Sequence, residues 1–262
     1  MFKCLQDAKN FKLNDDGYLY IDVGSSIDAP TACEFILKDP KANVIVIEPY
    51  RKNIEILTKG RDHEGIDFPY LRLEDKTILK SGEVLKSFDN PLLMLECAID
   101  RVVNPKMQNF HCTGDLNTGC SSLLEPIEEV LGVEVAEVLP VETVGLERVL
   151  DEMNFDGVIA MLKTDTQGKD FDVVRSMGKH LLKTLIVKSE YNTMGQYKGE
   201  PDDQGQAFRE YMESVGFSIR AAHETDVIFI NDKIQESLTE DEGHALSHHV
   251  VTVLNTLNIT SS

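Results

Sequence analysis

Two short apolar runs near the start of the chain end in residues that can hold a polar ligand. The run at 18–23 leads into Asp22-Val23-Gly24-Ser25-Ser26, and the run at 43–47 ends at Glu48. Short apolar runs bounded by turn residues are typical of buried strands. In an open parallel α/β sheet, ligands bind beyond the carboxyl ends of the strands. We therefore expect both groups of residues to lie at one ligand-binding edge.

The first group suits a cationic ligand better than a pyrophosphate. A dinucleotide fingerprint needs three glycines in the pattern G-x-G-x-x-G, and only Gly24 is present. Asp22 can orient the sulfonium and amino groups of S-adenosylmethionine (SAM), directly or through water. Gly24 lets the backbone lie against such a ligand. The structural alternative is an ordinary strand-to-helix turn that Asp22 caps.

Glu48 follows the second strand, where an acid can accept hydrogen bonds from both hydroxyls of an adenosine ribose. The alternative is a solvated strand-end carboxylate. A glycine turn after one strand and an acid after the next are more specific together than either feature alone, so we predict SAM as the cofactor. The predicted cofactor contacts lie at or just after the ends of the first three predicted strands: Asp22, Gly24, Ser25, Ser26, Glu48, Cys97 and Ala98.

A second polar group, Lys163-Thr164-Asp165-Thr166-Gln167-Gly168, ends the apolar run at 157–164. Asp165 can bind the SAM amino group, orient an acceptor hydroxyl or accept its proton. Positioning alone supplies much of the acceleration of a methyl transfer, and a base helps where the hydroxyl loses its proton in the transition state. Lys163 leaves the same strand face as Asp165, so a structural ion pair is the alternative. With Glu190 after the next strand, these are the candidate catalytic residues.

Alternating strands and helices must position these groups. We expect strands at 18–23, 43–47, 92–99, 157–164 and 185–188, an extra strand at 133–141, and a closing hairpin of 217–222 and 226–231. We expect helices after residue 29 and at 50–57, 146–153, 169–181, 204–215 and 237–257. Uninterrupted apolar strands between amphipathic helices predict an α/β fold with a mostly parallel sheet covered on both faces. The segment 59–90 carries no clean period.

Composition narrows the class of protein. The chain has 262 residues, 42% of them apolar, which is enough for one α/β domain spanning 1–262. We divide it into a SAM-binding half at about 15–100 and an acceptor-side half at about 101–232. Acidic residues exceed basic ones, 45 to 26, and such a surface repels nucleic acid phosphates. Five cysteines without a C-x-x-C pair, and no signal or membrane span, predict a cytoplasmic protein.

The spacing of two histidines gives only weak evidence for a metal site. His244 and His248 are four residues apart on the last predicted helix, but the glutamate of H-E-x-x-H is absent. We interpret them as a solvated helix face, interpret His111 as structural, and predict no metal ligand set. Magnesium held by oxygen ligands from Asp165, Asp170 and Glu190 is the alternative.

The quoted motifs, in this order, resemble the FkbM family of SAM-dependent methyltransferases. The resemblance runs from about Tyr18 to Asn231, and its most specific part is Leu162 to Gly168, similar to the family pattern Lys-Ile-Asp-Val-Glu-Gly with Gln167 at the usual acid. Further matches are Val46-Ile47-Glu48-Pro49, Ala98-Ile99-Asp100, Ser121-Ser122-Leu123, Glu147-Arg148-Val149-Leu150 and Glu190. The resemblance implies a seven-stranded Rossmann-like sheet with an antiparallel last strand. It also implies O-methylation of a sugar, glycan or other small molecule, with Lys163, Asp165 and Glu190 on the acceptor side.

Two other functions stay open at this stage. One is a nucleotide-cofactor oxidoreductase on a similar sheet, against which the two missing glycines count. The other is a non-catalytic SAM-binding protein with the same fold. The sequence names neither the acceptor nor the oligomeric state.

Overall fold

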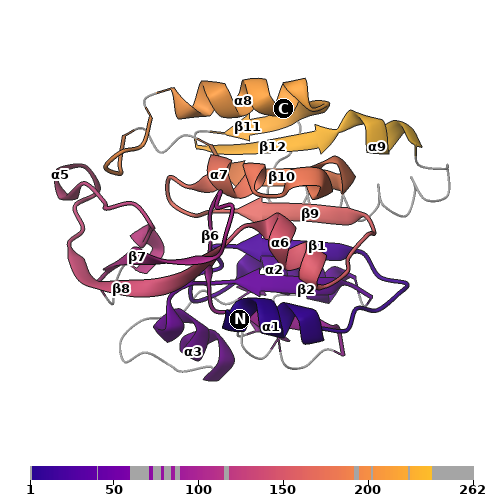
Figure 1. Cartoon of the computed structure of the whole chain (residues 1–262), viewed down its shortest axis with the longest axis horizontal. Helices are drawn as coiled ribbons and strands as arrows, with labels where there is room; N and C mark the ends of the chain where they lie inside the picture. The colour runs from indigo at the N-terminus through magenta and orange to yellow at the C-terminus, as the bar shows by residue number, and fades with distance from the viewer. Residues whose placement is uncertain are drawn as a thin grey trace.

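The computed structural model describes residues 2–39, 41–59, 71–72, 78–79, 84–85, 89–114, 118–191, 195–201, 203–223 and 225–237. A seven-stranded sheet forms its centre, in the order β11-β12-β10-β9-β1-β2-β5 (Figure 1). The strands are β1 (Leu19–Val23), β2 (Asn43–Ile47), β5 (Leu92–Leu95), β9 (Ile159–Thr164), β10 (Thr184–Glu190), β11 (Phe217–His223) and β12 (Asp226–Asn231).

Five neighbouring strands, from β5 through β2, β1 and β9 to β10, are parallel, and β12 is antiparallel to both β10 and β11. This confirms the predicted Rossmann-like sheet with an antiparallel last strand. Every residue of β1, β2 and β9 is buried, because helices cover both faces of the sheet.

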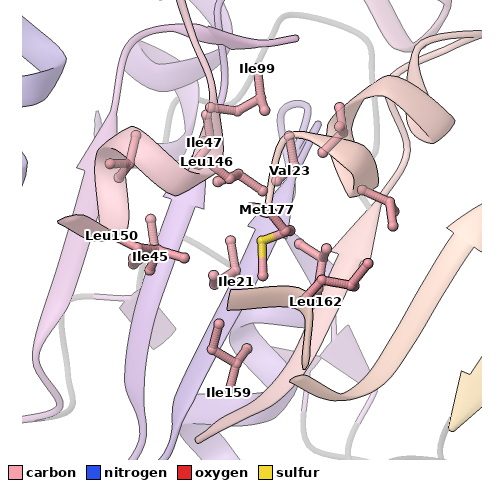
Figure 2. Packing of buried hydrophobic residues seen from close by; sticks show 14 of the residues in the cluster. Ile21, Val23, Ile45, Ile47, Ile99, Leu146, Leu150, Ile159, Leu162 and Met177 are labelled. Atoms are coloured by element: carbon pink, nitrogen blue, oxygen red, sulfur yellow. The ribbon is translucent and has the colours of Figure 1, made fainter. Parts of the chain in front are cut away.

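Two hydrophobic clusters lie on opposite faces of the sheet. One packs Ile21, Ile45 and Leu162 against α1, α6, α7 and α8 (Figure 2), and the other packs Val44 and Val46 against α2 and α3. The helices are α1 (Lys3–Asn10), α2 (Pro30–Lys38), α3 (Arg51–Lys59), α5 (Glu128–Leu131), α6 (Leu146–Glu152), α7 (Asp170–Arg175), α8 (Gln204–Ser214) and α9 (Asp232–Ser237). None of the helices described here combines the length and apolarity that a membrane crossing needs.

The predicted strand at 92–99 divides between two sheets, so its single-strand assignment was wrong. β5 ends at Leu95, and β6 (Ala98–Ile99) pairs instead with Thr143 and Val144 of β8 (Val135–Val144). β8 also pairs antiparallel with β7 (Lys106–Thr113), and this ribbon extends away from the main sheet in Figure 1. The extra strand predicted from its alternating residues is thereby confirmed.

The long helix predicted after Gly168 was also wrong. α7 ends at Arg175, and a 3-10 helix, η2 (Gly178–Lys183), follows. Gly178 has a φ of +51°, and a Cβ there would lie 2.2 Å from the Glu147 carboxyl carbon. The left-handed backbone at Gly178, two residues after the C-cap Ser176, favours a glycine and interrupts the predicted helix.

The chain ends differ from the sequence prediction as well. α1 was not predicted, because only Cys4, Leu5 and Ala8 of this short helix are buried. α9 begins at Asp232, before the predicted helix at 237–257, most of which lies outside the described residues. Within 59–90 the structure describes the short pair β3 (Leu71–Arg72) and β4 (Ile78–Leu79).

The turn after β1 lies directly against the turn after β9. The Asp165 backbone N–H donates to the Val23 carbonyl at 3.0 Å, so pairing continues past the end of β9. Gly24 has a φ of +76°, and a Cβ at this position would lie 1.9 Å from the Asp165 carbonyl oxygen. Gly24 is therefore required by a backbone contact, in addition to any contact with a ligand.

We predict that Gly24→Ala lowers the free energy of unfolding by about 3 kcal/mol or more, because both the backbone conformation and the contact with Asp165 are lost. Gly132→Ala is the matched control, since Gly132 has a φ of +66° and nothing within 4 Å of its added Cβ. It should lose only about 1–2 kcal/mol, the cost of the left-handed conformation. Urea denaturation measures both, and equal losses would refute the contact with Asp165.

Candidate active site

A cavity lies beside the carboxyl ends of β1, β2 and β9 and opens to solvent; its empty space, counted together with the solvent at its mouth, is about 650 Å³. Its lining residues come from both sheets and from the loops that follow their strands: Val23, Gly24, Ser26, Glu48, Pro49, Cys97, Ala98, Ile99, Phe110, Thr118, Gly119, Ser121, Leu123, Asp165, Thr166, Gln167 and Lys169. Parallel strands that end at one edge bring together residues far apart in sequence.

Most predicted cofactor contacts line this cavity: Gly24, Ser26, Glu48, Cys97 and Ala98. Asp22 and Ser25 are instead buried and are not among the lining residues. The side chains of Ser25 and Thr166 each leave a buried hydroxyl without a hydrogen-bond partner among the described residues. Buried polar atoms are normally paired, so these two hydroxyls are available to a ligand or a water.

Glu48 is buried and held in one orientation by three donors. Its Oε2 accepts from the Ser26 N–H at 2.9 Å, and its Oε1 accepts from the Tyr50 N–H at 2.9 Å and from Asn53 Nδ2 at 3.3 Å. Burial raises the pKa of Glu48 to about 7, and the two backbone donors limit the rise. Since Oε2 accepts one hydrogen bond only, it can accept another from a ligand hydroxyl.

Lys163 forms a buried ion pair with Asp22 beneath the cavity. Its Nζ lies 3.1 Å from Asp22 Oδ1 and donates to the Gly24 carbonyl at 2.8 Å. The second Asp22 oxygen accepts from the Ala32 N–H of α2 at 3.2 Å. Burial lowers the pKa of Lys163, but the charges of Asp22 and Asp165 outweigh it and raise that pKa above its usual value. Lys163 is therefore a charged structural link between β1, α2 and β9.

Asp165 lines the cavity, and 46% of its side chain is exposed. Its Oδ2 lies 3.8 Å from Lys163 Nζ, farther than Asp22 does, and its Oδ1 accepts from Gln167 Nε2 at 2.7 Å. The predicted Lys163–Asp165 ion pair is thus present, but its charges lie farther apart than those of the Lys163–Asp22 pair. Asp165 is the one predicted catalytic residue that reaches the cavity wall.

Glu190 lies behind Asp165 and is connected to it through Gln167, whose Nε2 also donates to Glu190 Oε2 at 3.0 Å. Burial, followed by the charges of Asp165 and Asp170, raises the pKa of Glu190 to about 8. Asp170 is buried too, and both its oxygens accept from the Thr166 N–H, at 3.1 and 3.2 Å. Burial raises the pKa of Asp170 to about 7.

No group of three or more His, Cys, Asp and Glu side chains in the described part of the chain could hold a metal ion. Asp165, Asp170 and Glu190 were the candidate magnesium ligands, and Asp170 is instead engaged with the Thr166 backbone. His111 pairs through its backbone with Ser122 and is not among the cavity residues. His244 and His248 lie outside the described residues.

The sequence prediction missed several residues of the site. Lys169 lines the cavity and forms ion pairs with Asp100 at 2.9 Å and Asp172 at 2.5 Å. Tyr197 is almost fully buried, and its hydroxyl lies 2.7 Å from Gln167 Oε1. The Gly/Ser content of 114–122 marked a loop, and Thr118, Gly119 and Ser121 from that loop line the cavity. Nothing in the local sequence linked Tyr197 to this edge.

The strand order and the cavity at the strand ends define a Rossmann-like methyltransferase fold. Residues 22–219 match the family described as the methyltransferase FkbM domain. The chain therefore belongs to the FkbM methyltransferase family, which favours methyl transfer over the oxidoreductase alternative. No curated protein and no solved structure matches the chain.

We predict that Lys163→Met lowers the free energy of unfolding by about 3–5 kcal/mol, because it leaves Asp22 as an unpaired buried charge. Adding Asp22→Asn should recover most of the loss, since the buried charge is then gone. Lys183→Met, which breaks the exposed ion pair with Asp156, should have little effect. Urea denaturation is measured on the wild type, Lys163→Met, Asp22→Asn, the double variant and Lys183→Met. Additive losses for the two buried substitutions would contradict the pairing.

Proposed function

We propose that the protein transfers a methyl group from SAM to a hydroxyl group of a sugar, glycan or other small molecule. One observation carries the proposal: a single cavity joins Gly24, Ser26 and Glu48 on one side to Asp165 on the other. The first group contains predicted contacts of a cofactor, and Asp165 is a carboxylate suited to an acceptor hydroxyl. Both reactants would then meet within one cavity.

The cofactor side of the cavity has groups that suit SAM. Glu48 Oε2 can accept from a ribose hydroxyl, and the unpartnered hydroxyl of Ser25 lies in the adjoining turn. Ile99, Phe110 and Leu123 provide an apolar wall that suits a flat aromatic base. When bound, SAM supplies the methyl group from its sulfonium sulfur.

On the acceptor side, Asp165 would orient the acceptor hydroxyl and take its proton as the oxygen forms its bond to the methyl carbon. The sulfur–methyl bond breaks as the oxygen–methyl bond forms, and the cofactor leaves as S-adenosylhomocysteine (SAH). Holding the oxygen in line with that bond provides most of the acceleration. Lys163 acts beneath both groups by fixing the ends of β1 and β9, rather than by contact with the acceptor.

Calorimetry with pure protein tests the cofactor half of the proposal. We expect SAM and SAH to bind and NAD⁺ not to bind; absence of SAM and SAH binding would refute the proposal. Incubation with labelled SAM and panels of sugars and lysate fractions then tests for a hydroxyl acceptor. Labelling of amines or thiols alone would contradict O-methylation.

Glu48→Ala is predicted to weaken SAM binding by about 1–3 kcal/mol, through the loss of a hydrogen bond to a charged acceptor.

Only the carboxylate form of Glu48 accepts hydrogen bonds at both oxygens, so the affinity for the cofactor should fall as the pH falls through about 7. 5′-Methylthioadenosine is the best probe, because it keeps the ribose and lacks the titrating amino group. Glu48→Gln should remove the pH dependence, and persistence of that dependence would refute the ribose assignment.

Asp165→Asn is predicted to lower kcat by about 10²- to 10⁴-fold, the usual contribution of a general base. The substitution keeps the shape and the acceptor oxygen that faces Gln167, so SAH affinity should not change. Methyl transfer from labelled SAM measures kcat, and calorimetry measures the affinity. Full activity in this variant would exclude Asp165 as the base, and an unchanged biological output would favour the non-catalytic alternative.

A further inference from the structure

Gln167 has a backbone conformation that its residue type rarely adopts. Its φ is +57°, in the left-handed region that favours glycine. The Ser122 hydroxyl donates to the Gln167 carbonyl at 2.7 Å, and Gly168, with a φ of +90°, follows it. A glycine at position 167 would fit this backbone without strain, so the reason for a glutamine lies in its side chain.

The side-chain amide of Gln167 satisfies three groups at once. Its two N–H groups have carboxyl oxygens as acceptors, Asp165 Oδ1 at 2.7 Å and Glu190 Oε2 at 3.0 Å. Its oxygen lies 2.7 Å from the hydroxyl of Tyr197, which is 1% exposed. Among side chains of this length, only that of glutamine offers two donors and an acceptor oxygen from one planar group. The ionised acid that is usual at this position in the family pattern would have no N–H to donate to Asp165 or Glu190.

Asp165 depends on this amide for its orientation. Its side chain is half exposed, and besides the hydrogen bond from the neutral Gln167 amide it has, among the described residues, the Lys163 ammonium at 3.8 Å. The amide has a firm support, because Tyr197 packs against Gly168, and Gln204 of α8 donates to the Gly168 carbonyl at 3.2 Å. Through the Gln167 amide, the buried ring of Tyr197 therefore restricts the position of the Asp165 carboxylate on the cavity wall.

We propose that Gln167 is a positioning residue that acts through Asp165, holding its carboxylate on the cavity wall at the place where the acceptor hydroxyl lies. This proposal rests on the proposed function, because it gives Asp165 its role towards the acceptor. Gln167 also holds Glu190, because each of its two amide N–H groups donates to one of the two carboxyl groups.

Gln167→Met tests the proposal, because methionine keeps the length of the side chain and loses all three hydrogen bonds. Gln206→Met is the matched control, since Gln206 donates to Glu210 on the exposed face of α8, at 2.7 Å. Crystal structures of the wild type and both variants give the rotamer of Asp165 without any acceptor. We expect the Asp165 carboxylate to turn towards Lys163, or to occupy several rotamers, in Gln167→Met only.

Kinetics with an acceptor from the labelled panel gives the second measurement. Gln167→Met should lower kcat by about 10- to 100-fold, as expected for a misplaced reacting group, and the KM for SAM should change less than about twofold. Tyr197→Phe removes the hydrogen bond to the Gln167 amide and a longer one, 3.2 Å, to the Cys120 carbonyl, and it leaves both N–H contacts of Gln167 in place. It should show a smaller decrease in kcat, and it provides the test if Gln167→Met does not fold.

An Asp165 rotamer unchanged from the wild type, or a kcat within twofold of the wild type, would overturn the proposal. Failure of the proposed function is a separate result, because it would show as absence of SAH binding by the wild-type protein. The rotamer comparison does not depend on that binding, so the two failures are distinguishable.

Discussion

The buried ion pair between Lys163 and Asp22 connects the two central strands at the edge where the cavity opens. Lys163 contacts Asp22 at 3.1 Å and the Gly24 carbonyl at 2.8 Å, while Asp22 also accepts from α2. A buried charge is costly unless it is paired, so each partner requires the other in place. The turn after β1 is thereby held against the turn after β9, and with it the two sides of the cavity keep a fixed separation.

The carboxylates at this edge differ in environment, and their tasks differ accordingly. Asp22 is paired and buried beneath the cavity, Glu48 is buried among backbone donors, and Asp165 is half exposed on the wall. Burial raises the pKa of Glu48 to about 7, while the Lys163 charge lies close to Asp22 and Asp165. Asp22 thus has a structural role, while Glu48 and Asp165 face the cavity. In the proposed function Glu48 binds the cofactor and Asp165 binds the acceptor hydroxyl.

The buried strands could be predicted from sequence because apolar residues predominate in each of them. β2 occupies 43–47 as predicted, and β1 and β9 are shorter than their predicted ranges by one or two residues. The break after Leu95 is marked in the sequence by the single charged residue Glu96, and the apolar run resumes at Cys97. The change of partner from β2 to β8 at Ala98 and Ile99 could not be predicted from that one residue. A change of sheet is decided by tertiary pairing, which hydrophobicity alone does not encode.

Part of the candidate site could also be predicted, because several of its residues follow strands that the sequence predicts. Gly24, Glu48 and Asp165 follow strands, so their common edge could be inferred from the order of elements. The function of Gly24 was harder to infer, because the backbone of Asp165 that excludes a side chain there lies 141 positions further along the chain. Gln167 and Tyr197 are 30 positions apart, and no local pattern indicates that a buried ring supports that amide.

A crystal structure of the protein with SAH would test the central claim most directly. The account predicts that the adenosine ribose lies within hydrogen-bonding distance of Glu48, about 2.6–3.2 Å. It also predicts that the sulfur faces Asp165 across the cavity lined by Gly24 and Ser26. SAH bound elsewhere on the protein, or in this cavity with its ribose away from Glu48, would contradict the account.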